Sequence, residues 1–147
     1  MVTSIRKGNL DDLVHVHGLV RELAIYEKAE HEFIATLEDY QNDFRAGIFE
    51  VLLAETEGIV IGMCLYYLSY STWKGKMLYL EDFVVKQSYR QEGVGQQLFD
   101  ALIQEAKQKR CRLIKWQVLD WNEAAIKFYK KNNAIIEQEW WNGKIIF

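Results

Sequence analysis

The sequence predicts a mixed α/β domain, and three observations support this. Two long runs, residues 48–55 and 59–70, are rich in the β-branched and aromatic residues typical of strands. Apolar residues recur at helical spacing before these runs and again after residue 93. In the second half, a strand, a glycine-containing turn and a long helix follow one another, as in a strand–helix–strand unit.

The first half is expected to hold two helices between strands. Residues 2–6 can form the first strand, and Asn9 can cap a helix that ends near residue 27. Thr36 is the next candidate cap, for a helix that Gly47 can end. Glu57-Gly58 separates the two long apolar runs and reads as a hairpin turn.

The second half is expected to continue in a regular order. Its predicted elements are a strand at 77–85, a helix at 93–109, a strand at 113–119, a helix capped by Asn122, and strands at 134–141 and 144–147 around the hairpin signal Asn142-Gly143. The full order is then β-α-α-β-β-β-α-β-α-β-β, in one domain of 147 residues.

Composition excludes several classes of function. The net charge of −3 does not support nucleic-acid binding, which usually needs a basic surface. No apolar run reaches the length of a membrane span. Cys64 and Cys111 have no partner at ligand spacing, so we expect free buried thiols and no metal. The start of the chain lacks the apolar segment of a signal peptide, which favours a cytoplasmic protein.

The strongest chemical signal is Arg90-x-x-Gly93-x-Gly95, between a strand and a long helix. The first N–H groups of a helix have no internal partners, and glycines let an anion approach the backbone. The segment is therefore a candidate pyrophosphate site, to which Arg90 can add charge-assisted hydrogen bonds. The alternative is an ordinary helix start with two glycines for close packing. The P-loop and dinucleotide-binding patterns are both missing.

Longer segments give the turn a family context. The sequence resembles the GNAT superfamily of acetyltransferases, and within it the spermidine/spermine (diamine) N-acetyltransferases. The resemblance covers nearly the whole chain and rests on the Arg90–Gly95 turn and on the segments 21–27 (RELAIYE), 79–85 (YLEDFVV), 118–123 (VLDWNE) and 128–130 (FYK). It implies the acyl-CoA N-acyltransferase fold, acetyl-CoA as co-substrate and a homodimer.

The resemblance also implies two sets of binding residues. Those expected to hold the coenzyme are Phe83, Val84, Val85, Arg90, Gln91, Glu92, Gly93, Val94, Gly95, Gln96, Asn122, Glu123, Ala124, Ala125 and Tyr129. Those expected to line the amine site are Tyr26, Glu27, Glu81, Lys115, Trp116 and Gln117.

Catalysis is expected to involve Tyr129 and Glu81. In related enzymes the tyrosine that matches Tyr129 is the general acid, and a phenol with a pKa near 10 stays protonated at pH 7. Glu81 can bind an ammonium group and pass its proton out through water. Glu81 and Asp82 are neighbours in a strand, so we expect them on opposite faces. The alternatives are a packed Tyr129 and carboxylates that form salt bridges.

The sequence thus predicts an N-acetyltransferase that acts on a primary amine of a small cationic molecule, a di- or polyamine first. A lysine-like amino acid such as thialysine is the second candidate acceptor. Two further alternatives stay open: acetylation of protein lysines or N-termini, and an acetyl-CoA-binding domain without turnover.

Overall fold

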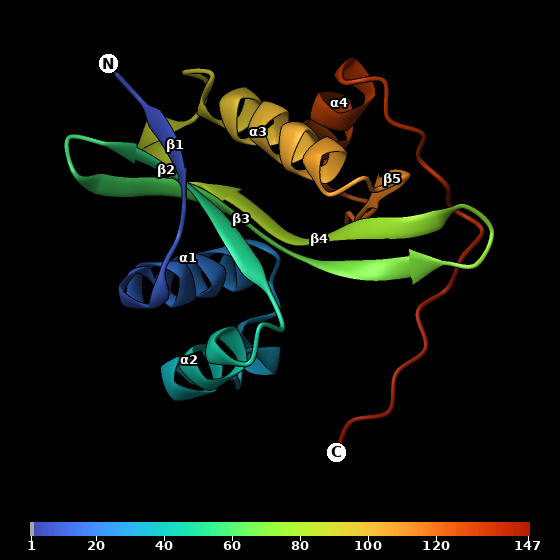
Figure 1. The fold of residues 1–147 in the computed structure, drawn as a ribbon, viewed down its shortest axis with the longest axis horizontal. Coiled ribbons are helices and arrows are strands. Elements are labelled where there is room, and N and C mark those ends of the chain that lie inside the picture. Colours follow the sequence, from blue (N-terminus) through green and yellow to red (C-terminus); the bar gives the residue numbers. More distant parts are fainter. Residues whose placement is uncertain (1) are drawn as a thin grey trace. The chain divides into compact units, whose positions relative to one another are not determined.

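A computed structural model describes residues 2–147, and its chain divides into two units, residues 1–116 and 117–147, which are treated separately. The first unit holds a five-stranded sheet in the order β1-β2-β3-β4-β5 (Figure 1). Its strands are β1 (Ser4–Lys7), β2 (Glu50–Thr56), β3 (Ile59–Ser71), β4 (Gly75–Val85) and β5 (Leu113–Lys115). Neighbouring strands are antiparallel except β5, which runs parallel to β4. The mixed sheet is therefore confirmed.

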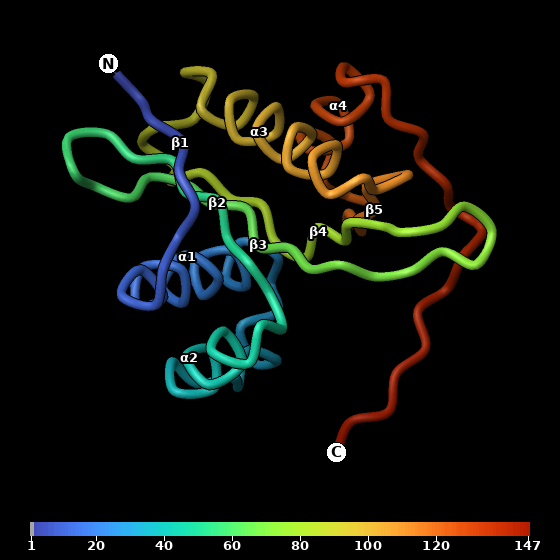
Figure 2. Tube along the Cα trace, viewed as in Figure 1, coloured from blue at the N-terminus to red at the C-terminus, as the bar shows by residue number. Residues whose placement is uncertain are grey.

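Helices cover both faces of the sheet. The helices α1 (Leu13–Tyr26) and α2 (Leu37–Arg45) lie on one face, and α3 (Val94–Gln108) lies on the other (Figures 1 and 2). The main core joins apolar residues of α1 to those of β2, β3 and β4, and α2 packs against its rim. Short 3-10 turns at Leu10–Asp12, Glu30–Glu32 and Gln87–Tyr89 connect these elements. No helix within residues 2–147 is both long and apolar enough to cross a membrane.

Several local predictions are confirmed by the backbone. Thr36 caps α2 by accepting a hydrogen bond from the Asp39 N–H at 3.0 Å, and the Thr36 N–H donates in turn to the Asp39 carboxylate at 2.8 Å. Glu57 and Gly58 both have positive φ, at 50° and 75°, as a type I′ hairpin turn requires. Asn9 caps a 3-10 turn rather than α1 itself, which begins directly after that turn.

A β-bulge interrupts β4 at Glu81. Leu65 pairs with Asp82, but the next residue of β3, Tyr66, pairs with Leu80, so Glu81 is an extra residue without a partner. Beyond the bulge, Asp82 and Val84 lie on the α1 side, because Val84 and Leu65 belong to the core that α1 covers. A bulge shifts the alternation of side chains by one residue, which decides where the carboxylates of this strand point.

Two expected strands differ from the prediction. β5 ends at Lys115 instead of residue 119, and it pairs only with Met77–Tyr79, just before the bulge in β4. Residues 134–147 form no strand, so the expected order is correct only as far as α4 (Glu123–Lys131). The unit 117–147 contains no strand to which this tail could add, and an isolated hairpin is only marginally stable in water. Trp141 is accordingly 95% exposed.

A charged network joins α3 to the sheet. The buried Glu105 of α3 accepts hydrogen bonds from the Tyr66 hydroxyl and from Lys7, whose ammonium is 2.8 Å away. Burial raises the pKa of Glu105, but the hydrogen bonds from Lys7 and Tyr66 outweigh this and lower it. The carboxylate is therefore ionised and partnered, and it anchors the helix that follows the glycine turn.

Candidate active site

The turn between β4 and α3 has the backbone of an anion site. Gln91 and Gly93 have positive φ, 65° and 83°, and α3 begins at the next residue, Val94. No side chain caps this helix, and the first N–H groups of a helix have no partner within the helix itself. A Cβ at Gly93 would meet nothing within 4 Å, so its left-handed backbone, rather than crowding, requires glycine there.

Gly95 has a different role in the same turn. A Cβ built on it would contact Phe83 at 3.6 Å and Val85 at 3.8 Å, which is ordinary van der Waals contact. The first turn of α3 therefore packs directly over the end of β4. The segment from Arg90 to Gln96 and the strand residues Phe83–Val85 are brought together, as the resemblance implied.

We expect the Gly93→Ala variant to weaken coenzyme binding. Alanine at a φ of 83° costs roughly 1–2 kcal/mol, which the turn can relieve by shifting its amides. The Michaelis constant for acetyl-CoA should rise about tenfold, a change worth roughly 1.4 kcal/mol. Gly47→Ala is the matched control, because Gly47 has a φ of 75° and equally open surroundings after α2. Equal effects of the two variants on this Michaelis constant would contradict the assignment.

The second half of β4 has an open edge. Among the described residues, β5 pairs with β4 only up to Tyr79, so no strand covers this edge from Leu80 to Val85. The Lys86 N–H donates to Ile61 of β3 at 2.8 Å, and successive residues alternate in direction. Phe83 and Val85 therefore direct their backbone groups to the open edge, and Val84 faces β3. The Val85 carbonyl already accepts a hydrogen bond from Arg90 Nε at 3.0 Å. An edge of this kind can bind an extended chain with amide groups, as pantetheine has.

Glu81 and Asp82 lie on the same face of the sheet, which corrects the expectation of opposite faces. The Tyr67 hydroxyl donates to the Glu81 carboxylate at 3.0 Å, and the Tyr67 ring stacks on Tyr79 at 5.5 Å. Tyr79 is two residues before Glu81, so the two share a face. The charges of both carboxylates raise the pKa of Tyr40 in α2, after the larger effect of burial. Both therefore face the side of α1 and α2, because of the bulge.

Asp82 has the most altered carboxyl in this group. Burial, followed by the charges of Glu81 and Glu27, raises its pKa to about 7. Burial also raises the pKa of Glu27, the cap residue that follows α1. The charges of Glu27 and Glu81, from two distant parts of the chain, thus both act on Asp82. A cation with several amino groups is the natural counter-ion for such a group.

The remaining residues expected at the amine site lie nearby or in the other unit. Tyr26 is the last residue of α1, and the guanidinium carbon of Arg90 lies 5.5 Å from the centre of its ring. Lys115 is the exposed last residue of β5 and pairs with Tyr79. Trp116 contacts Phe99 of α3 edge-on at 5.8 Å. Gln117 opens the second unit, where its side chain hydrogen-bonds Asn142.

The unit 117–147 holds the expected general acid. Asn122 caps α4 by accepting a hydrogen bond from the Ala125 N–H at 3.2 Å, as predicted. The cap starts the helix at Glu123 and Ala124, in the segment expected to line the coenzyme. Tyr129 lies on α4 and contacts the neighbouring Phe128 ring edge-on at 5.6 Å. Its role as general acid stays a prediction.

Sequence reasoning missed part of this site. The sequence predicts Asp82 on the opposite face from Glu81, and it does not place the rings of Tyr40, Tyr67 and Tyr79 at this site. Tyr79 and Glu81 have the spacing of two residues that places strand neighbours on one face, so this pair could have been found. The position of Asp82 depends on the bulge, for which the sequence gives no local sign.

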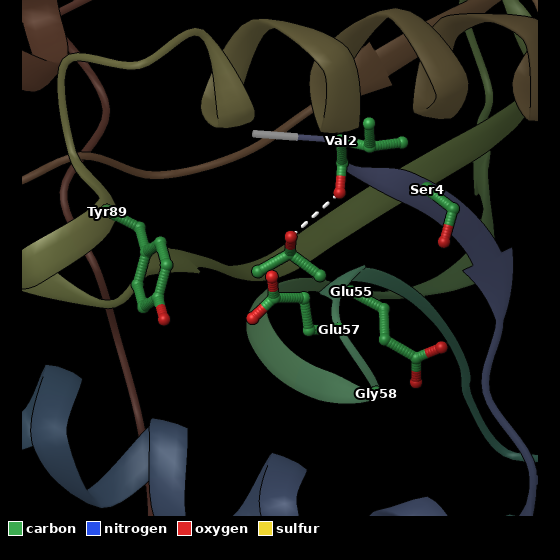
Figure 3. A pocket seen from close by; sticks show the side chains of 7 residues that line it. Val2, Ser4, Glu55, Glu57, Gly58 and Tyr89 are labelled. Carbon is green, nitrogen blue, oxygen red and sulfur yellow. Dashed lines mark hydrogen bonds between the residues drawn. The ribbon is translucent and has the colours of Figure 1, made fainter.

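A separate hollow of about 520 Å³ lies between the start of β1, the β2–β3 turn and the turn that follows β4 (Figure 3). It is lined by Val2, Ser4, Glu55, Thr56, Glu57, Gly58 and Tyr89. The Thr56 hydroxyl donates to the Val2 carbonyl at 2.7 Å, and Arg6 pairs with Glu55 at 2.9 Å. Its polar groups are thus partly used within the protein. It contains none of the residues predicted for catalysis.

These features together define a class of enzyme. An anion at the start of α3 would let the rest of an extended ligand follow the open edge of β4, next to Asp82. This is the arrangement of an acetyl-CoA-dependent N-acetyltransferase. Residues 16–134 match the model of the acetyltransferase (GNAT) family. The chain belongs to this family.

Individual relatives agree with this assignment. The chain is 37% identical over 150 residues to thialysine N-epsilon-acetyltransferase of Bos taurus, covering 94% of this chain and 88% of the relative. It is 31% identical over 140 residues to spermidine/spermine N(1)-acetyltransferase-like protein 1 of Homo sapiens, covering 89% of this chain and 20% of that protein. The solved aminoglycoside N-acetyltransferase AAC(6')-Iy in complex with CoA has a similar fold, with a TM-score of 0.79, 21% identity and coverage of 97% and 95%.

Proposed function

We propose that this N-acetyltransferase acetylates a primary amine of a small cationic molecule, with a di- or polyamine as the first candidate. The observation that supports this most is the half-buried Asp82 on the α1 side of β4, on which the charges of Glu81 and Glu27 both act. Tyrosine rings lie beside them, and aromatic faces attract alkylammonium groups. Burying a carboxylate away from water is costly unless a cation pairs with it, so the site favours a bound ammonium.

The chain's own groups have distinct roles in this proposal. The amides at the start of α3 hold the coenzyme's pyrophosphate, and the open edge at Phe83 and Val85 aligns its arm. When bound, acetyl-CoA supplies the activated acetyl group. Glu81, exposed and bonded to Tyr67, orients the ammonium and passes its proton to water. Tyr129 donates a proton to the departing thiolate. Holding both substrates in attack geometry can itself be worth roughly 7–11 kcal/mol.

A thiol-release assay with acetyl-CoA tests this function. The acceptors should be putrescine, spermidine, spermine, lysine, thialysine and a lysine peptide. We expect release with at least one di- or polyamine at a rate above that of the peptide. Release only with the peptide would favour a protein-modifying enzyme. Binding of acetyl-CoA without release for any amine would favour a non-catalytic domain.

A lysine-like acceptor such as thialysine is the second candidate, and Lys115 is the observation that favours it. An amino acid brings its own carboxylate, which Glu27 and Asp82 would repel. Lys115 extends from the end of β5 beside Tyr79, on the rim of the same site, and could pair with that carboxylate. The relative from Bos taurus carries the name of this activity.

The Lys115→Gln variant separates the two acceptors. Removing the ammonium should raise the Michaelis constant for thialysine about threefold and lower that for spermidine about twofold, the size expected for one exposed charge. The measurement is steady-state kinetics with both acceptors at low and high salt. Lys74→Gln is the control, because Lys74 is an exposed lysine in the β3–β4 turn. If Lys115→Gln moves the two constants in the same direction, Lys115 does not discriminate between the acceptors.

The expected homodimer stays a prediction. The exposed apolar side chains of the tail, among them Ile145, Ile146 and Phe147, are compatible with a partner but do not identify one.

A further inference from the structure

Arg90 connects the coenzyme turn to the end of α1. Its Nε donates to the Val85 carbonyl at 3.0 Å, at the last residue of β4. Its guanidinium carbon lies 5.5 Å from the centre of the Tyr26 ring, within the range of a cation–π contact. The bond to Val85 fixes the direction of the side chain. The Arg90 side chain is thus held by two contacts, one with the Val85 carbonyl and one with the Tyr26 ring.

Tyr26 is directly linked to the acidic site. It is the last residue of α1, and Glu27 follows as the cap, with its N–H bonded to the Leu23 carbonyl at 2.9 Å. The chain then turns sharply, since Lys28 has a φ of 59°. The Glu27 carboxylate is one of the two charges that act on Asp82. Because Glu27 is the next residue along the chain, the position of Tyr26 bears directly on where the Glu27 carboxylate lies.

We propose that Arg90 is a positioning residue for the amine site, an inference that rests on the proposed function. Its guanidinium holds Tyr26, and through it Glu27, at the place where the ammonium binds. The coenzyme turn then sets the affinity for the acceptor as well as for acetyl-CoA. This role differs from that of a phosphate ligand, which would affect the coenzyme alone.

The test is a double-mutant cycle with Arg90→Gln, Tyr26→Leu and the double variant. Each single variant should raise the Michaelis constant for the best amine three- to fivefold, roughly the effect of one exposed cation–π contact. The double variant should be no worse than the worse single variant, because both remove the same contact. Calorimetry with CoA measures coenzyme affinity separately in all four proteins.

A second cation–π contact on the same helix provides the control. Arg21 lies 5.8 Å from the Phe33 ring centre, away from the coenzyme turn. Arg21→Gln should therefore leave the Michaelis constant for the amine unchanged within about twofold.

Three results would overturn the inference. They are single effects that multiply in the double variant, a change in CoA affinity without a change for the amine, and an equal effect of Arg21→Gln. A wild-type protein that releases no thiol with any acceptor would overturn the proposed function and this inference together. Normal wild-type turnover with any of the three results would overturn the inference alone.

Discussion

The Asp82→Asn variant should be more stable than the wild type at pH 8 and yet a poorer enzyme. Burial and two neighbouring carboxylates raise the pKa of Asp82 from 3.8 to about 7. The folded state therefore favours the neutral form, and that stabilisation is complete below about pH 3.8 and lost as the pH rises through 7. At pH 8, removing the charge should raise the free energy of unfolding by about 2–4 kcal/mol.

Activity should change in the opposite direction. The ionised Asp82 is desolvated and attracts the ammonium, so its loss should lower kcat/KM for a cationic amine at least about tenfold. In the wild type, kcat/KM should rise with pH as Asp82 ionises near pH 7. In the variant, kcat/KM should lack this rise.

Urea unfolding at pH 5 and pH 8, with kinetics over the same range, measures both effects. At pH 5 the folded Asp82 is protonated but the unfolded one is ionised, so the stability advantage of the variant should be smaller than at pH 8 and should vanish only below about pH 3.8. Asp39→Asn is the matched control. Hydrogen bonds from the Thr36 backbone and side chain lower the pKa of Asp39, so that variant should lose stability at pH 8. Unchanged stability of Asp82→Asn at pH 8 would show that the buried charge costs nothing.

The Tyr129→Phe variant should fold normally and turn over at least about tenfold more slowly, because general acids typically contribute 10²–10⁴-fold. The ring contact with Phe128 does not need the hydroxyl, so α4 should be unaffected. The loss should fall on kcat, since the proton is needed only as the thiolate leaves. Steady-state kinetics at saturating acetyl-CoA and amine, with thermal unfolding, provide the measurement.

Tyr70→Phe is the control for this variant. It removes the same hydroxyl from a side chain of β3 that is 71% exposed, and both turnover and melting temperature should stay at wild-type values. If Tyr129→Phe matched Tyr70→Phe at saturating substrates, Tyr129 would not be the general acid.

The features predicted correctly are those with local causes. Thr36 and Asn122 cap helices with their own oxygens, and Glu57-Gly58 turns the chain through two left-handed residues. Each depends on side chains within three or four residues, so the sequence alone reveals it. The glycine turn before α3 belongs to the same group, because Gly93 adopts the positive φ that glycine tolerates best.

The features predicted wrongly depend on partners far along the chain. Glu81 and Asp82 share a face because β3 pairs unevenly with β4, which no window around these residues reveals. The tail has a strong hairpin signal at Asn142-Gly143, yet residues 134–147 form no strand. A strand pattern predicts which residues could pair, but pairing also requires an available edge.

Because of the bulge, the pairing of β3 with β4 does not depend on Glu81. A chain shortened by this one residue would keep Leu80 opposite Tyr66 and Asp82 opposite Leu65, as both are now. Insertion or deletion of a single codon could therefore add or remove a carboxylate on the α1 side of β4 without rebuilding the core. The side chain at this point of the strand can therefore change while the pairing of β3 with β4 stays the same.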